Sequence, residues 1–208
     1  MKDKTKVWNI YAPVYNLFMR RNRAAYEKMY ERIRAAVRDK KVLELCTGTG
    51  LIAKNTAFYA SEYIATDFAE NMLKEAKKGP LPDNLAFARV DATDIPFSDG
   101  EFDAVIISNA LHVIPDPEKA LSEAGRVLKP GGLLIAPNFI HISESFSAGM
   151  TAKLLSAAGI AFEAKWDEDA YADFLSRNGW EVRRREVFEA AIPLMYTECV
   201  RNGEKKEV

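Results

Sequence analysis

Apolar residues along this chain follow two alternating patterns: short continuous runs, and stripes with a spacing of three or four residues. The runs predict buried strands and the stripes predict helices that cover them. Between residues 41 and 138 the two patterns alternate, which is typical of parallel strands joined by crossover helices. The expected strands span residues 41–45, 62–66, 85–90, 102–108 and 133–137. The expected helices span residues 51–59, the stretch around 72–76, and 117–128.

The alternation stops after residue 137. Residues 139–166 form a long connection with a helical stretch at 148–158, which predicts a lid or a substrate-binding insertion. A helix follows at 167–177, with Asp167 as the N-cap and Gly179 just past its end. Two further strands, at 180–188 and 192–200, are joined closely enough to predict an antiparallel pair at the sheet edge. The sheet therefore has seven expected strands.

The first 40 residues predict a helical cap ahead of the sheet. Tyr26, Tyr30, Ile33 and Val37 make one apolar stripe within a helix at 24–38. Its other faces are mostly basic, which indicates either a solvated surface or a contact with an anionic substrate or membrane. The whole chain, residues 1–208, is expected to be a single domain with a cap (1–40), a core (41–138), an insertion (139–166) and a C-terminal helix and strand pair (167–201).

Polar residues follow the ends of the expected parallel strands. The first strand carries Glu44 and leads into a loop with Gly48 and Gly50, and the second ends at Asp67, seventeen positions after Gly50. Glycine lets the backbone approach a nucleotide-like ligand closely, and a carboxylate at this distance can accept both ribose hydroxyls. Asp91 and Asn109 follow the third and fourth strands. Because parallel strands end at one edge of the sheet, these groups should line one crevice.

Five segments in this order resemble the class I S-adenosylmethionine-dependent methyltransferases. They are residues 42–50, 64–72, 91–97, 102–112 and the sequence Arg-Val-Leu-Lys-Pro-Gly-Gly at 126–132. The resemblance covers about residues 40–138. It implies a Rossmann-like α/β fold with a mostly parallel seven-stranded sheet, helices on both faces, and an antiparallel strand pair at the C-terminal end. It also implies methyl transfer from S-adenosylmethionine to a small or amphipathic organic acceptor, leaving S-adenosylhomocysteine.

The resemblance also implies which residues bind the cofactor. Gly48 and Gly50 match the loop that passes under the cofactor. Asp67 matches the carboxylate that binds the ribose hydroxyls, and Asn109 matches the residue that contacts the methionine portion. Asp91 and Ala92 match the adenine position, although a strand-end turn is the other explanation for either aspartate. The remaining implied contacts are Glu44, Cys46, Thr47, Phe68 and Met72, and from the N-terminal segment Tyr11 and Tyr15.

Cys46 departs from the family, which usually has glycine at this position. A reactive thiol and a small apolar filler are the two explanations, and the second fits a tight loop better.

Three residues are candidates for the acceptor pocket: His112, Asn138 and His141. His112 is also the candidate general base, because it follows Asn109 by three positions; a packing or hydrogen-bonding histidine is the alternative. Tyr11 and Tyr15 resemble the N-terminal tyrosines of methyltransferases that act on quinone precursors or phospholipid amines, and ordinary aromatic packing is the alternative.

The composition of the chain limits the classes of molecule that it is expected to bind. A formal net charge of −1 argues against nucleic acid, and no apolar run is long enough for a membrane span, although the basic helix is compatible with weak peripheral membrane contact. Cys46 and Cys199 predict a reduced, cytoplasmic protein, and with two histidines they do not form a metal site. We therefore expect a monomer or homodimer that binds a small-molecule or lipid-like acceptor.

Two other functions fit parts of the sequence. Gly48, Gly50 and Ala53 satisfy the spacing of an NAD-dependent oxidoreductase. That reading leaves Glu44 and the 126–132 segment without a role. A catalytically silent binding protein of the same fold is the second alternative, and cofactor titration separates all three.

Overall fold

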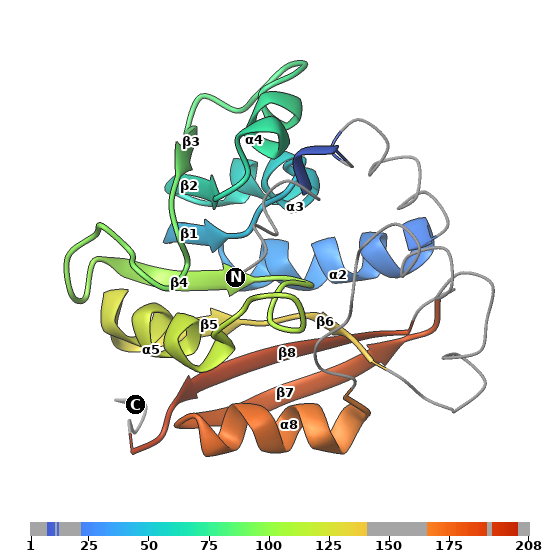
Figure 1. Ribbon diagram of the computed structural model, residues 1–208, viewed down its shortest axis with the longest axis vertical. Coiled ribbons are helices and arrows are strands. Elements are labelled where there is room, and N and C mark those ends of the chain that lie inside the picture. The colour runs from blue at the N-terminus through green and yellow to red at the C-terminus, as the bar shows by residue number, and fades with distance from the viewer. Residues whose placement is uncertain (1–7, 11, 13–21, 141–165, 191–192, 204–208) are drawn as a thin grey trace.

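The computed structural model describes residues 8–10, 12, 22–140, 166–190 and 193–203 (Figure 1). Their strands form one eight-stranded sheet in the order β3-β2-β1-β4-β5-β8-β6, with β7 paired to β8. Neighbours among the first five strands of the chain are parallel. These strands are β1 (Lys41–Leu45), β2 (Glu62–Asp67), β3 (Leu85–Arg89), β4 (Phe102–Ile107) and β5 (Leu128–Ile135). The predicted α/β fold with a mostly parallel sheet is confirmed.

The C-terminal strands β7 (Trp180–Phe188) and β8 (Leu194–Arg201) form the predicted antiparallel pair. The eighth strand, β6 (Asn138–Phe139), is one more than the sequence predicted. Its two residues pair with Met195 and Leu194 of β8. A strand of two residues is too short to show an alternating pattern, so only its pairing with β8 reveals it.

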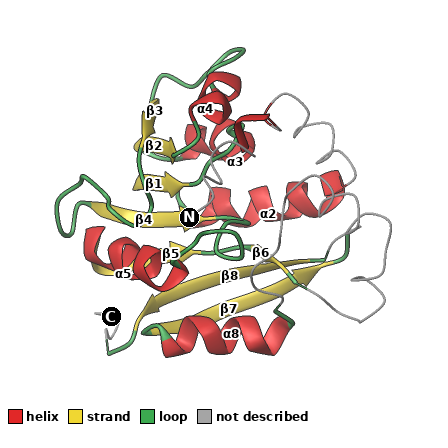
Figure 2. Ribbon diagram, in the orientation of Figure 1, coloured by secondary structure: helices red, strands yellow, loops and turns green. Residues whose placement is uncertain are grey.

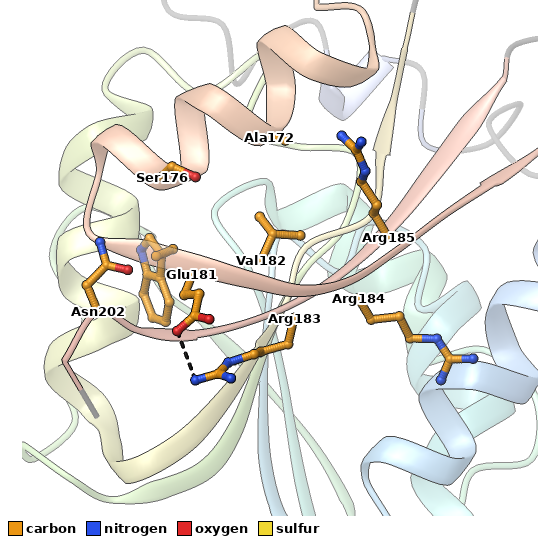
Figure 3. Close-up of a pocket in the computed structure, with 9 residues that line it drawn as sticks. Ala172, Ser176, Glu181, Val182, Arg183, Arg184, Arg185 and Asn202 are labelled. Carbon is orange, nitrogen blue, oxygen red and sulfur yellow. Dashed lines mark ion pairs between the residues drawn. The ribbon is translucent and has the colours of Figure 1, made fainter. Parts of the chain in front are cut away.

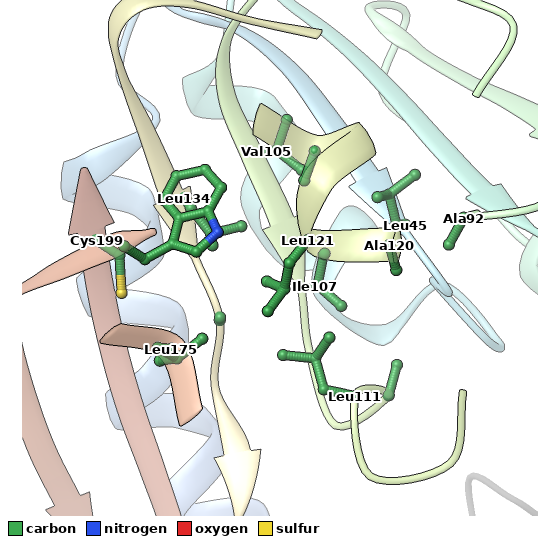
Figure 4. Packing of buried hydrophobic residues seen from close by; sticks show 14 of the residues in the cluster. Leu45, Ala92, Val105, Ile107, Leu111, Ala120, Leu121, Leu134, Leu175 and Cys199 are labelled. Carbon is green, nitrogen blue, oxygen red and sulfur yellow. The ribbon is translucent and has the colours of Figure 1, made fainter. Parts of the chain in front are cut away.

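Helices cover both faces of the sheet (Figure 2). The described helices are α2 (Arg23–Ala36), α3 (Leu51–Thr56) with the 3₁₀ turn η2 (Ala57–Tyr59), α4 (Glu70–Ala76), α5 (Pro117–Val127) and α8 (Glu168–Arg177). Successive side chains of a strand point to opposite faces. In β4, Val105 and Ile107 therefore pack with α5 and α8 (Figure 4). Ile106, between them, packs with α2 and α3 on the other face.

Local capping sets where several helices begin and end. The backbone N–H of Ala170 donates to Asp167 Oδ1 at 2.8 Å, which confirms the predicted N-cap of α8. Gly179 has a φ of +85°, which suits its predicted position after the helix. β5 begins at Leu128, earlier than the predicted residue 133, because the backbone is already extended at Leu128 and pairs with Phe102 across a register shift.

Arg126 explains the structural role of the 126–132 segment. Its guanidinium donates to the backbone carbonyls of Ile95 and Phe97 at 2.7 and 2.8 Å. It also pairs with Glu123 at 2.8 Å and Asp99 at 2.7 Å. These contacts fasten the loop after β3 to α5, and the carboxylates raise the pKa of Arg126 further above its ordinary value.

Replacing Arg126 by Ala is expected to lower the free energy of unfolding by about 2–3 kcal/mol, because two partly buried carbonyls lose their donor. Urea denaturation measures the change. Arg126→Lys should lose less, since one ammonium keeps some of the bonds. Arg177→Ala, at the exposed end of α8, is the control and should change stability by under about 0.5 kcal/mol. A loss no larger than this control would contradict the role assigned to Arg126.

Most of the predicted insertion, residues 141–165, lies outside the described residues, and so does the helix expected at 148–158. The division of the chain into cap, core, insertion and C-terminal part stays a prediction. Within the part of the chain that the structure describes, every helix is too short or too polar to cross a membrane.

Candidate cofactor and acceptor site

Most of the predicted site residues that the structure describes follow the carboxyl ends of the parallel strands. β1 lies between β2 and β4, so the loops that follow these three strands are neighbours. The loop after β1 is bonded to the end of β2, since Gly48 N–H donates to Asp67. The loop after β4 is bonded to the chain after β5, where Asn109 N–H donates to the Pro137 carbonyl at 2.8 Å. The loops that follow these strands are thus linked by hydrogen bonds, and the crevice between them stays a prediction.

Asp67, the predicted ribose carboxylate, is held by two backbone N–H groups at the end of β2. Its Oδ2 accepts from Gly48 N–H and its Oδ1 from Ala69 N–H, each at 2.8 Å. Burial raises the pKa of Asp67, and these backbone donors limit the rise. A carboxylate oxygen can accept more than one hydrogen bond, so both oxygens keep acceptor capacity for a pair of hydroxyls. This geometry fits the ribose role that the sequence implied.

The two loop glycines are required for different reasons. A Cβ added to Gly48 would meet no atom within 4 Å, so the backbone here borders open space. A Cβ on Gly50 would lie 3.2 Å from the Ala76 Cβ and 3.4 Å from the ring of Phe87. Both glycines have positive φ, +57° and +75°. Gly48 is therefore available to a ligand, whereas Gly50 packs the loop against α4 and β3.

Cys46 occupies the left-handed region with a φ of +56°, which explains why the family prefers glycine there. Its side chain is partly buried against the core between the sheet and α5. Burial, with the nearby charges of Asp67 and Asp91, raises the pKa of the Cys46 thiol well above its ordinary value. A protonated thiol is a poor nucleophile, so the geometry favours the filler explanation.

The strain at Cys46 can be measured with two variants that both lack the thiol. Cys46→Gly is expected to be more stable than Cys46→Ala by about 1 kcal/mol, because only alanine keeps a Cβ in the left-handed region. In a relaxed backbone the order would reverse, since glycine has the larger entropy of unfolding. Urea denaturation gives the order. Both variants should keep methyl transfer, and its loss in both folded variants would indicate thiol chemistry.

Glu44 lies beneath the glycine loop, with an exposed fraction of 2%. The Tyr63 hydroxyl on β2 donates to its Oε2 at 2.7 Å. Burial raises the pKa of Glu44 to about 7, and the charge of Asp67 adds to the rise. In the described structure this carboxyl group therefore supports the loop from below, bonded to β2. Direct contact with the cofactor stays a prediction.

The residues next to Asp67 contain a feature that sequence reasoning missed. Phe68 is 44% exposed, and the guanidinium of Arg89 lies over its ring at 4.9 Å from the centroid. Arg89 Nε also donates to the Phe68 carbonyl at 3.1 Å. The basic residue at the end of β3 gave no signal in the sequence. It holds an exposed aromatic ring beside Asp67.

Asp91 and Ala92 lie one strand further along. Asp91 Oδ1 accepts from the Thr93 backbone N–H at 2.9 Å and from its hydroxyl at 2.7 Å. This is the strand-end turn that the sequence offered as the alternative explanation. None of the described residues bonds Asp91 Oδ2. Ala92 is buried, and the adenine role of both residues stays a prediction.

The N-terminal segment contacts the first turn of α4. Asn71 N–H donates to Asn9 Oδ1 at 2.9 Å, and Asn71 Nδ2 donates to the Asn9 carbonyl at 3.2 Å. Ala12 packs with Ala69 and with Met72, which is 2% exposed. Met72, five residues after Asp67, is thus covered by this segment. Tyr11, Tyr15 and His141, which were predicted to line the site, lie outside the described residues.

Asn109, predicted to contact the methionine portion of the cofactor, follows the end of β4 in an unusual backbone conformation. Its φ is +51°, and its Nδ2 donates to the Tyr26 hydroxyl of α2 at 2.8 Å. Asn109 Oδ1 is buried and has no hydrogen-bond partner among the described residues. A buried polar atom without a partner is unfavourable unless a ligand or water satisfies it. Asn109 Oδ1 therefore fits a ligand that carries a hydrogen-bond donor, as the methionine portion of S-adenosylmethionine does.

His112 and Asn138, both predicted to line the acceptor pocket, are in contact. His112 Nδ1 lies 2.8 Å from Asn138 Oδ1, and both side chains are almost fully buried. The His112 ring is tilted against Phe139, with 6.2 Å between centroids. The loop after β4 and the short strand β6 thus bring together two of the three predicted pocket residues.

A separate cleft of about 410 Å³ lies between α8 and β7 (Figure 3). Three consecutive arginines line it, and each is paired with a carboxylate: Arg183 with Glu181, Arg184 with Glu198, and Arg185 with Asp169. The cleft contains none of the predicted site residues, and its cations are already neutralised. It does not belong to the candidate site.

Known proteins match the chain over the same region. Residues 43–136 match a family model described as a methyltransferase domain. A demethylmenaquinone methyltransferase from Clavibacter sepedonicus is 40% identical over 106 residues, which cover 50% of this chain and 43% of that protein. A ubiquinone/menaquinone biosynthesis C-methyltransferase from Desulfotalea psychrophila is 35% identical over 156 residues, covering 71% of this chain and 61% of that protein. The chain thus matches about half the length of such relatives.

The fold extends beyond the matched segment. A structure solved as a DhpI–SAH complex aligns with a TM-score of 0.72 over 96% of each chain, at 22% identity. At that identity the likeness establishes the fold alone. The sequence matches thus give a methyltransferase domain at residues 43–136, and the chain is similar in sequence and in fold to S-adenosylmethionine-dependent methyltransferases.

Proposed function

We propose that this protein transfers the methyl group of S-adenosylmethionine to a small, amphipathic aromatic acceptor of the quinol type. One observation carries the cofactor assignment: Asp67 is fixed between Gly48 N–H and Ala69 N–H, next to the open space at Gly48. A ribose diol placed there meets a fixed carboxylate and an approachable backbone. The acceptor class is supported by the quinone precursors in the names of the matched relatives.

The chemistry makes modest demands on the protein. Bound S-adenosylmethionine supplies an electrophilic methyl group, whose bond to sulfur breaks with the electron pair left on sulfur as the acceptor atom binds the methyl. The chain's own residues must hold the two reactants in line and exclude water, and positioning of this kind can contribute up to about 7–11 kcal/mol. For a carbon acceptor, removal of a hydroxyl proton raises the electron density on the ring. His112 is the candidate base for that proton.

The proposal is tested first by binding. Calorimetric titration of the full chain with S-adenosylhomocysteine should give one site, and titration with NAD should give no heat of binding. No binding of S-adenosylhomocysteine by a folded sample would overturn the proposal. Binding of NAD in its place would favour the oxidoreductase alternative.

The second test uses S-adenosylmethionine labelled on the methyl group. It is incubated with the protein and with separate acceptors: a demethylated naphthoquinol, a phenol, an amine and vesicles containing phosphatidylethanolamine. Label on the ring carbon of the quinol is the expected result. Label on the phospholipid amine alone would keep methyl transfer but overturn the acceptor class. Binding without transfer to any acceptor would favour a silent binding protein.

A further inference from the structure

Asn138 is oriented by its own neighbour on β6. Its Nδ2 donates to the Phe139 carbonyl at 3.0 Å, and its Oδ1 faces His112 Nδ1 at 2.8 Å. Exchanging the amide nitrogen and oxygen would place Oδ1 against the Phe139 carbonyl, so that two acceptors would meet. The orientation with oxygen toward the histidine is therefore the one that satisfies both contacts.

This orientation fixes the proton on His112. An amide oxygen only accepts hydrogen bonds, so Nδ1 must carry the hydrogen in the 2.8 Å contact. A neutral imidazole has one N–H, which places the basic lone pair on Nε2. In free imidazole side chains both nitrogens can carry the hydrogen. The buried amide removes that choice, since both side chains are less than 5% exposed.

The surrounding backbone keeps the pair in place. Asn138 and Phe139 pair with Met195 and Leu194 of β8, and Ile140 N–H donates to the Pro193 carbonyl at 3.0 Å. On the other side, the loop that carries His112 is held by the bond from Asn109 N–H to the Pro137 carbonyl. The two ends of the contact are thus anchored to the same sheet, which limits rotation of the ring.

We propose that Asn138 is a positioning residue: it holds His112 as the Nδ1–H tautomer so that Nε2 is the atom that takes the acceptor's proton. The inference rests on the proposed function, because it assigns a task to its candidate base. In the step, Nε2 forms the new N–H bond, and the electron pair of the acceptor's O–H bond stays on oxygen. After the ring carbon is methylated, its own proton restores the hydroxyl, and the proton on His112 leaves to solvent.

The tautomer is measured without any methyl acceptor. Two-bond ¹H–¹⁵N correlation spectra of the neutral imidazole distinguish Nδ1–H from Nε2–H, and the spectrum of His112→Gln assigns the signals of the two histidines. The wild-type protein should show Nδ1–H at His112. Asn138→Leu should lose that preference and gain the Nε2–H form. An Nε2–H tautomer in the wild type, or no change in Asn138→Leu, would overturn the proposal even where methyl transfer itself is confirmed.

Kinetics supply the second readout, with the acceptor found in the labelled-methyl screen. Asn138→Leu should lower kcat by about 10- to 100-fold, within the range of general-base catalysis, while the Kd for S-adenosylhomocysteine stays within about twofold. Asn138→Asp keeps an acceptor at Nδ1, so it should restore most of kcat and move the acidic limb of the pH profile to higher pH. Asn202→Leu, at the far end of the sheet, is the matched control. Equal losses of kcat in the Leu and Asp variants would indicate a merely structural role.

Discussion

Asp67→Asn is expected to weaken the binding of S-adenosylhomocysteine by about 100-fold. The amide replaces a charged acceptor of two ribose hydroxyls by a neutral one, and a hydrogen bond to a charged group contributes about 1.5–3 kcal/mol. Each carboxylate oxygen of Asp67 accepts a hydrogen bond from a backbone N–H, of Gly48 or of Ala69, at 2.8 Å. In the asparagine variant an NH₂ group replaces one of these oxygens and faces a backbone N–H, so that two donors meet. The loss of about 2.7 kcal/mol in binding corresponds to the expected hundredfold change in Kd.

Calorimetry on the wild type and the variant gives the two Kd values, and a urea melt checks that the variant folds. Asp83→Asn is the matched control, because Asp83 is an exposed carboxylate in the loop before β3. Its Kd should equal that of the wild type. An Asp67→Asn protein that folds and binds within threefold of the wild type would show that the ribose lies elsewhere.

Glu44 is expected to make the protein less stable as the pH rises from about 4.5 to above 7. The pKa of Glu44 is raised from its ordinary value of 4.5 to about 7, with burial as the largest cause and the charge of Asp67 as a smaller one. Between these values the folded state binds a proton that the unfolded state has released. Stability therefore falls with increasing pH across this window. Each unit of pKa shift corresponds to about 1.4 kcal/mol, so the full loss is about 3 kcal/mol.

The effect is isolated by comparison with Glu44→Gln, which keeps the size of the side chain and removes the titration. The difference in unfolding free energy between wild type and variant, from urea denaturation at each pH, should fall by about 3 kcal/mol between pH 4.5 and 8. The bond from the Tyr63 hydroxyl is available to an amide oxygen as well, so the variant is expected to fold. A difference that is flat, or that rises with pH, would contradict a buried and protonated Glu44.

Local sequence was sufficient for most of the scaffold. The alternation of apolar runs and stripes predicted β1 and β7 with their observed bounds, and it placed β2, β3 and β4 within one residue at their ends. Asp167 was recognisable as an N-cap because capping depends on neighbouring residues. The order of motifs along the chain also predicted that Gly48 and Asp67 would lie together, because parallel neighbouring strands end at one edge.

Contacts between distant residues could not be predicted in the same way. The Tyr26 hydroxyl meets Asn109 across 83 positions, and Glu44 meets Tyr63 through the register of β1 with β2. In the sequence, Tyr26 was only a member of an apolar stripe. The hydrogen-bond partner of the Tyr26 hydroxyl depends on how α2 packs against the sheet.

The family resemblance and the residue types determined the cofactor class, the crevice at the strand ends and His112 as a candidate base. The tertiary structure decided the rest: that Cys46 lies in a strained left-handed turn, that Glu44 is buried under the loop, and that Asn138 faces His112 Nδ1. Periodicity and capping are local, so the sequence displays them directly. The hydrogen bond between β6 and the loop after β4 depends on tertiary structure, because β6 is held in the sheet by its pairing with β8.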